Sequence, residues 1–286
     1  PERLWEGDAD LLRGRAVPET MAAALTRLPI AGPKTVVMGV RCVQPVLSDV
    51  PLADETPEAD DEAPARGLRL GTAITAVVGR SGSGKTTLVR ALAGIIPPTS
   101  GSISLGDVPA SIGELRGNAT MVFQQSTLGD GTIRDNLLAI NPNLTSDDID
   151  ELAEKAQLTT VVARLTHGWD TPVGELGAQL SGGERQRVGI ARSLAKPAHV
   201  LLVDEATSAL DPRNERAIVS TLDRIRADYT TVVITHRPAM IGIADQVIVM
   251  DNASIIEAGP PQELERAGGE FARIMAEWRA SAAWRV

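Results

Sequence analysis

The sequence predicts an α/β fold with a mostly parallel sheet, and three observations carry that prediction. Continuous apolar runs of strand length occur, such as Val200–Val203 and Thr231–Thr235, without the alternation expected of a sheet with one wet face. Helix-like segments, notably Asn214–Ala227, separate these runs. A glycine-rich loop, Gly79–Thr87, lies between another apolar run and a helix-like run. Together they predict right-handed βαβ units in a doubly wound sheet.

The loop follows the phosphate-loop pattern of two spaced glycines and then Gly-Lys-Ser/Thr. It follows the apolar run Ile74–Val78 and precedes the helix-like run Leu88–Ala93, which is the strand–loop–helix context that the motif requires. The alternative, a glycine-rich turn with an accidental lysine, does not explain this agreement. We therefore expect a nucleotide polyphosphate to bind at Gly79, Ser81, Gly82, Ser83, Gly84, Lys85, Thr86 and Thr87.

Three side chains of the loop have distinct expected roles. The Lys85 ammonium supplies a positive charge for the β- and γ-phosphates. The Thr86 hydroxyl is placed to bind Mg²⁺, and Thr87 is placed for the α-phosphate. These assignments predict ATP or a related nucleotide with Mg²⁺ as cofactor, and an enzyme that acts on the polyphosphate.

Composition limits the functional classes. The chain has 286 residues, 43% of them hydrophobic, so a substantial core is available. A net charge of −9 argues against a nucleic-acid partner, which would require a basic face. The lone Cys42 allows no internal disulfide, which fits a reducing compartment. No apolar run is long enough to span a membrane, and the start does not resemble a signal peptide.

The remaining elements are expected in order along the chain. A leader over residues 1–34 connects to something upstream, and an acidic, solvated loop with six carboxylates covers residues 53–66. Further strands are expected at Thr35–Val43, after the turn that starts at Pro97, at Ala119–Phe123, and in the hairpin of Gln246–Met250 and Ser254–Glu257. Further helices are expected at residues 144–166, with Thr145 or Ser146 as the cap, at 183–195, and in the tail from 261.

Two carboxylates and a histidine follow expected strands, at the edge where such sheets bind ligands. Asp204 ends an apolar strand and can hold the water shell of a metal. Glu205 comes next, where it can act as general base or orient the attacking water. His236 follows the next strand, and its position alone leaves a surface histidine as an equal alternative.

The stretch Leu180–Glu184 has the sequence features of a second anion-binding site. A Ser-Gly-Gly turn opens a helix and presents N–H groups, a hydroxyl and a positive helix end. One nucleotide does not need two such sites in one chain. We therefore expect Ser181, Gly182 and Gly183 to serve a nucleotide on another molecule.

These motifs resemble those of the nucleotide-binding domain of an ATP-binding cassette (ABC) transporter, over residues 35–260. In order along the chain they are the phosphate loop, Gln124 of the Q-loop, the signature Leu180–Glu184, Asp204-Glu205, the D-loop Ser208–Asp211 and the switch histidine His236. The resemblance implies a P-loop NTPase core, a small antiparallel β subdomain and a helical signature subdomain over about residues 125–183. It also implies a linker, 1–34, from a membrane domain and a C-terminal helical tail, 261–286.

The resemblance also implies a mechanism. Two such domains pair head to tail, as a homodimer or heterodimer, with each ATP held between one phosphate loop and the partner's signature. Gln124 would contact Mg²⁺ and water and couple closure to the membrane part, while Asp211 would cross the interface. Glu205, His236, Gln124 and Lys85 would be catalytic, and Thr86, Gln124 and Asp204 would hold the metal. The domain would lie at the cytoplasmic face of a cell membrane.

Two further segments resemble the exporter type, Gly131–Leu137 and Asp170–Glu175. In that type the residue corresponding to Glu175 lies in a loop that contacts the transmembrane domain; the alternative is an ordinary helix start. One departure is Gln44, which stands where the family stacks an aromatic side chain on adenine. This departure and the acidic loop leave an alternative function, an ATP-gated regulatory or dimerisation module, or the low-turnover half of an asymmetric heterodimer.

Overall fold

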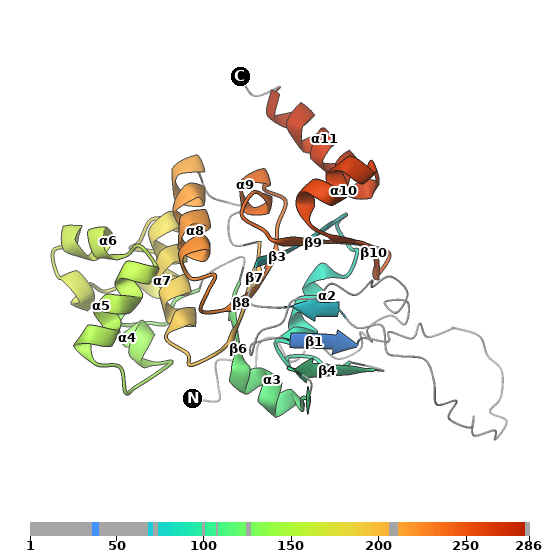
Figure 1. The fold of residues 1–286 in the computed structure, drawn as a ribbon. Helices are drawn as coiled ribbons and strands as arrows, with labels where there is room; N and C mark the ends of the chain where they lie inside the picture. The colour runs from blue at the N-terminus through green and yellow to red at the C-terminus, as the bar shows by residue number, and fades with distance from the viewer. Residues whose placement is uncertain are drawn as a thin grey trace, which may run out of the picture.

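The computed structural model describes residues 36–39, 68–70, 74–98, 101–106, 108–123, 127–205 and 211–283. Its centre is a six-stranded sheet with the strand order β10-β9-β3-β8-β7-β6 (Figure 1). The strands are β3 (Ile74–Gly79), β6 (Ala119–Val122), β7 (Val200–Asp204), β8 (Thr230–Ile234), β9 (Gln246–Asp251) and β10 (Ser254–Gly259). All neighbouring pairs are parallel except β9 with β10, so the predicted mostly parallel sheet is confirmed.

The strands of the sheet whose sequences are uniformly apolar are buried. Every residue of β3 and of β8 is buried, as is Val200–Val203 of β7. Such strands need cover on both faces, because neither face alternates with polar side chains. The register then brings Asp204 opposite Ile234 at the carboxyl end of the sheet.

A second, antiparallel sheet has the order β2-β1-β4-β5. Its strands are β1 (Val36–Gly39), β2 (Leu68–Leu70), β4 (Ser102–Leu105) and β5 (Val108–Pro109). It lies beside α2 at the opposite end of the molecule from the helices α4 to α6 (Figure 1). The expected small antiparallel part is therefore present, and its first strand lies within the predicted Thr35–Val43.

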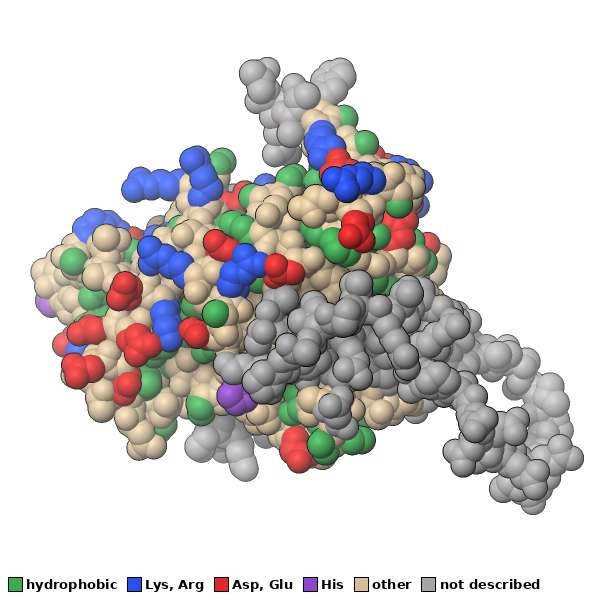
Figure 2. Space-filling model, in the orientation of Figure 1, with side chains coloured by type: hydrophobic (Ala, Val, Ile, Leu, Met, Phe, Trp, Pro, Cys, Tyr) green, Lys and Arg blue, Asp and Glu red, His purple; other side chains and the backbone are tan. Residues whose placement is uncertain are grey.

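Helices account for most of the remaining described chain. They are α2 (Lys85–Leu92), α3 (Ile112–Asn118), α4 (Ile133–Leu138), α5 (Ser146–Lys155), α6 (Thr159–Arg164), α7 (Gly182–Leu194), α8 (Pro212–Arg224), α9 (Pro238–Ile241), α10 (Pro261–Ala267) and α11 (Glu270–Ala283), with short 3₁₀ turns η2 (Gly168–Asp170) and η3 (Glu175–Gly177). Figure 2 shows acidic side chains gathered over α5, which carries Asp147, Asp148, Asp150, Glu151 and Glu154.

Several helices differ from expectation for local reasons. The predicted helix over 144–166 is two helices, because Gln157 adopts a left-handed φ of 54° between α5 and α6. Thr145 is the cap of α5, and its hydroxyl accepts the Asp148 N–H. The tail is also two helices, since Gly268 ends α10 with a left-handed φ of 70°. The helix α3 was not predicted; its capping box of Ser111 and Glu114 marks it in the sequence.

In the part of the chain that the structure describes, three apolar clusters pack the helices against the sheets. The third joins β3 and β9 to α11, through Val78, Val249 and Phe271 among others. Within the described residues, no helix combines the length and the apolar character needed to cross a bilayer.

Candidate nucleotide site

The phosphate loop has the backbone geometry that an anion cradle needs. Gly79, Gly82 and Gly84 all have left-handed φ values, 142°, 81° and 95°. At Gly79 a β-carbon would lie 2.1 Å from the Met250 carbonyl oxygen, so a glycine is required there. Gly84 precedes α2 without any side-chain cap, which leaves the first N–H groups of this helix available to an anion.

Lys85 lies folded over this loop. Its Nζ donates hydrogen bonds to the carbonyl oxygens of Gly79 (2.9 Å) and Arg80 (2.8 Å). Burial lowers the pKa of Lys85, while the nearby carboxylates of Glu205 and Asp204 act in the opposite direction. The ammonium is thus held at the loop and close to both carboxylates.

The Ser83 hydroxyl is buried and has no hydrogen-bond partner among the described residues. The side chain of Ser83 is 3% exposed. Buried hydroxyls are nearly always hydrogen-bonded, and an unsatisfied one calls for an explanation. A phosphate oxygen bound in the loop would accept this hydrogen bond, so the residues present fit the expected polyphosphate.

Thr86 and Asp204 fit a magnesium ion. The Thr86 hydroxyl hydrogen-bonds the Asp204 carboxylate at the carboxyl end of β7. Burial, then repulsion by Glu205, raises the pKa of Asp204, and the Thr86 hydrogen bond opposes that rise. A cation beside Asp204 would offset both effects, and Mg²⁺ prefers hydroxyl, carboxylate and phosphate oxygens.

Glu205 and His236 form the pair expected of a hydrolytic site. The Glu205 Oε1 lies 2.9 Å from the His236 Nε2. The pairing follows from the sheet, because β7 and β8 are neighbours and each residue comes just after its strand. Glu205 has a left-handed φ of 47°, and its N–H donates to the Ile234 carbonyl oxygen (3.1 Å). Non-glycine residues in this conformation store strain and gather at functional sites.

The signature residues open α7. Ser181 caps the helix: its hydroxyl accepts the Glu184 N–H (3.4 Å), and the Glu184 carboxylate accepts the Ser181 N–H (2.9 Å). Ser181 and Gly182 are exposed, and a β-carbon on Gly182 would meet nothing within 4 Å. The Ser181 O–H remains a donor while its oxygen accepts the cap. This end of α7 can therefore reach an anion on another molecule.

Asp211 caps α8 and connects it to α7. Its carboxylate accepts the N–H groups of Arg213 (2.9 Å) and Asn214 (3.1 Å) and the Asn214 amide (2.5 Å). The Asn214 oxygen in turn accepts a hydrogen bond from Arg187 Nη1 of α7 (3.0 Å). The hydrogen bonds of the Asp211 carboxylate to described residues all lie at this helix end.

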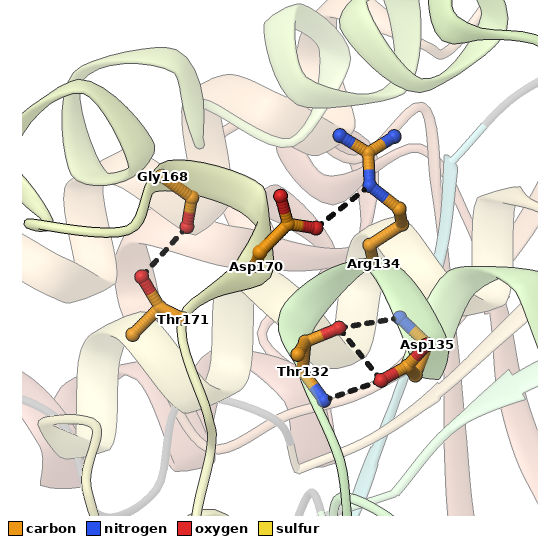
Figure 3. Close-up of polar contacts among 6 residues, drawn as sticks. All are labelled: Thr132, Arg134, Asp135, Gly168, Asp170 and Thr171. Carbon is orange, nitrogen blue, oxygen red and sulfur yellow. Dashed lines mark hydrogen bonds and ion pairs between the residues drawn. The ribbon is translucent and has the colours of Figure 1, made fainter.

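The two exporter-like segments lie against each other, as Figure 3 shows. Arg134 Nε donates to Asp170 Oδ1 (3.1 Å), and Thr132 pairs with Pro172 in an antiparallel bridge. Thr132 and Asp135 form a capping box at the start of α4, while the Thr171 hydroxyl donates to the Gly168 carbonyl oxygen (2.7 Å). These contacts lie at the start of the segment that leads to the exposed Glu175.

The structure thus brings together Lys85, Thr86, Asp204, Glu205 and His236. Gln124, Gln44, the acidic loop 53–66, the linker 1–34 and residues 208–210 of the D-loop lie outside the described residues. Sequence reasoning missed the bridging role of Asn214 and the contact of Trp278 with His236. Asn214 could have been found as the third residue after the capping Asp211.

Comparisons with known proteins agree with this geometry. A family profile described as "ABC transporter" matches residues 71–208. The chain is 45% identical over 215 residues to the mycobactin import ATP-binding/permease protein IrtB of Mycolicibacterium thermoresistibile, covering 74% of this chain and 37% of that protein. It is 46% identical over 204 residues to the ATP-dependent lipid A-core flippase of Bordetella avium, covering 70% of this chain and 34% of that protein.

A solved structure gives the same result. The structure of a bacterial Atm1-family ABC exporter with ATP bound superposes with a TM-score of 0.71 at 32% identity, over 92% of this chain and 44% of that chain. The chain thus spans about a third of the length of the curated relatives cited, 37% and 34%. The chain therefore belongs to the ABC transporter family and corresponds to an ATP-binding domain of the exporter type.

Proposed function

We propose that this domain binds and hydrolyses Mg-ATP and drives movement of a substrate across a membrane. The observation that carries the proposal is the pair of Glu205 and His236, joined at 2.9 Å beside the buried Lys85. A carboxylate at this place can take a proton from the attacking water or orient it. The imidazole donates to that carboxylate through Nε2 and can hold it toward the water.

The other residues bind and orient the nucleotide. The amides of Gly79, Gly82 and Gly84 line the cradle with the Ser81, Ser83 and Thr87 side chains, and Lys85 neutralises the β- and γ-phosphates. Thr86 and Asp204 hold Mg²⁺, in part through water, together with Gln124. When bound, the metal polarises the phosphate oxygens and offsets developing charge.

Two such domains close around two ATP molecules. The exposed Ser181 and Gly182, with Gly183 behind them, complete the site on a partner domain, and Asp211 crosses the interface. Closure is passed to a transmembrane domain through the loops of Gln124 and Glu175, at the cytoplasmic face of a cell membrane. The names of relatives at 45% and 46% identity include both an import protein and a flippase, so the proposal concerns the motor and names no cargo.

Replacing the Glu205 carboxylate with an amide of nearly the same shape tests this proposal. We expect Glu205→Gln to lower the ATP hydrolysis rate at least 100-fold while keeping ATP binding, since general-base catalysis contributes about 10²–10⁴-fold. Mg-ATP should then accumulate a dimer of the variant, visible by sedimentation velocity. Hydrolysis unchanged in the variant would contradict the role of Glu205.

The second candidate is the ATP-gated regulatory module or low-turnover half of a heterodimer. Gln44, at the adenine-stacking position, favours it. Its signature is ATP-dependent dimerisation with negligible turnover in the wild-type chain and no further loss in Glu205→Gln. If ATP turnover by the wild-type chain is lost in Glu205→Gln, the transport ATPase is supported over the regulatory module.

A further inference from the structure

The helix α11 carries an apolar stripe that ends beside the catalytic pair. Phe271, Ile274, Met275 and Trp278 recur at the spacing that places side chains on one helix face. The first three are buried against β3 and β9, at 1%, 8% and 7% exposure. Trp278 is only partly buried in the same cluster, so core packing does not use the whole side chain.

The rest of the Trp278 indole lies against His236. The two ring centroids are 6.1 Å apart and the planes meet at 80°, an edge-to-face contact. The same imidazole bonds Glu205 through Nε2. His236 is otherwise rather open, with its side chain 42% exposed, so these two contacts restrict its rotation.

The helix itself is held at both ends. At its start, the Glu257 carboxylate accepts the N–H groups of Glu270 (2.5 Å) and Phe271 (3.0 Å). Near its end, Arg279 pairs with Glu265 of α10 at 2.5 Å. Trp278 thus belongs to an anchored element and can serve as a fixed surface for the imidazole.

We propose that Trp278 is a positioning residue that holds the His236 imidazole in the orientation that bonds Glu205. This inference rests on the proposed hydrolytic function of the pair. It gives the C-terminal helix a role in turnover, although the helix follows the phosphate loop by about 200 positions and shares no motif with it. Loss of one edge-to-face contact corresponds to about a 3- to 10-fold change in the population of the held orientation.

Steady-state kinetics of the 286-residue protein test the proposal. Trp278→Leu keeps apolar bulk against the cluster but removes the aromatic contact. We expect it to lower kcat about 3- to 10-fold with the KM for ATP changed less than twofold, because the step affected follows binding. Trp278→Phe should restore most of the loss. In the His236→Ala background, Trp278→Leu should have no further effect.

A matched control separates positioning from stability. Met275→Ala removes a buried side chain of the same stripe and has no aromatic contact with His236. It should lower the melting temperature and leave kcat unchanged at temperatures where the protein is folded. A kcat loss in Met275→Ala equal to that in Trp278→Leu would overturn the proposal, as would an unchanged kcat in Trp278→Leu.

A second readout does not need hydrolysis. The chain has three histidines, so the ring-proton resonances of His236 can be assigned with a His236→Ala spectrum. An indole beside the imidazole shifts these resonances, and Trp278→Leu should move them while Met275→Ala should not. Unmoved resonances refute the positioning contact. If the resonances move but the wild-type protein neither binds nor hydrolyses Mg-ATP, the proposed function fails and the contact stands.

Discussion

Gly79 is the last residue of β3 and the first of the phosphate loop. Only a residue without a β-carbon fits there. Its φ of 142° suits glycine alone, and a β-carbon would lie 2.1 Å from the Met250 carbonyl oxygen. Gly82 has a φ of 81°, but a β-carbon there would meet nothing within 4 Å. Substitution at Gly79 would therefore cause both a steric clash and backbone strain, whereas substitution at Gly82 would cause backbone strain alone.

We expect Gly79→Ala to lower the free energy of unfolding by about 3 kcal/mol, the sum of overpacking and of an unfavourable left-handed φ. Gly82→Ala should cost only about 1–2 kcal/mol, because strain alone applies. Urea denaturation measures both. Equal losses would show that the Met250 contact relaxes freely.

The raised pKa of Asp204 gives a pH-dependent prediction for the ligand-free protein. The folded state binds this proton more tightly than the unfolded state, so stability is lost as pH rises from the unfolded value, about 3.9, through the folded one. Asp204→Asn removes that loss. We expect the variant to melt at a higher temperature than wild type at pH 7, and the gap to close toward pH 4. A wild type that melts higher at pH 7 would contradict the burial argument.

Single residues were the most predictable part of this site. The proximity of Lys85, Asp204 and Glu205 could be predicted, because Lys85 lies in a loop of recognisable pattern and the two carboxylates lie at the end of an apolar strand. The position of His236 left a surface histidine as an equal alternative, and only the resemblance to the ABC family favoured its place in the site. The contact of Trp278 with His236 could not be predicted, because it joins residues from two elements whose relative placement no local pattern encodes.

At the scale of elements, α7 and α8 meet through Gly183 and Asn214. A β-carbon on Gly183 would lie 2.2 Å from the Asn214 side chain. The Asn214 amide also bridges Asp211 and Arg187. The signature helix and the start of α8 are therefore joined by one side chain.

A double-mutant cycle tests this link. Gly183→Ala alone should destabilise the protein by about 1–3 kcal/mol through overpacking. In an Asn214→Ala background the same change should be neutral or stabilising by up to about 1 kcal/mol, because alanine is the better helix former. Gly182→Ala is the control: its β-carbon would be open on all sides, so its effect should be the same in both backgrounds. Additive losses for Gly183 and Asn214 would contradict the contact.

Element types were largely predictable from the sequence, whereas element breaks were not. The buried strands followed from apolar runs, and Thr145 followed from its capping chemistry. The division of 144–166 depends on Gln157 at a φ of 54°, a conformation that glutamine rarely adopts. It ends α5, and the Leu158 N–H donates to the Ala153 carbonyl oxygen (2.7 Å). Because glutamine is not a typical helix-ending residue, the sequence alone did not indicate the boundary between α5 and α6.

At the scale of the whole molecule, α11 is an integral part of the core. Phe271 is 1% exposed and packs in the cluster that also contains the central strand β3. We expect Phe271→Ala to cost about 3–5 kcal/mol and to lower the melting temperature by about 6–15 °C in one cooperative transition. Ala276→Ser, on the exposed side of α11, should change stability by less than about 0.5 kcal/mol. A separate early transition in a calorimetric scan would show that α11 unfolds independently.

The strand order could be predicted only in part. Parallel strands with helical crossovers were expected from the alternation of elements. The position of β3 between β8 and β9 depends on pairing between residues more than 150 positions apart, such as Ile74 and Thr231, and uniformly apolar strands do not specify which neighbour they take.

This placement of β3 has a consequence for the protein's synthesis. The ribosome makes the phosphate loop before the strands on both sides of β3. The Met250 carbonyl that excludes a side chain at Gly79 and the Ala253 N–H that donates to the Ser83 carbonyl oxygen also come after the loop. At about 5–20 residues per second, a ribosome needs roughly 10–30 s to make the intervening chain. For that interval the nascent polypeptide has the complete phosphate-loop sequence without the neighbours that shape it, so we expect the loop to reach its observed conformation only once β9 and its hairpin have left the exit tunnel.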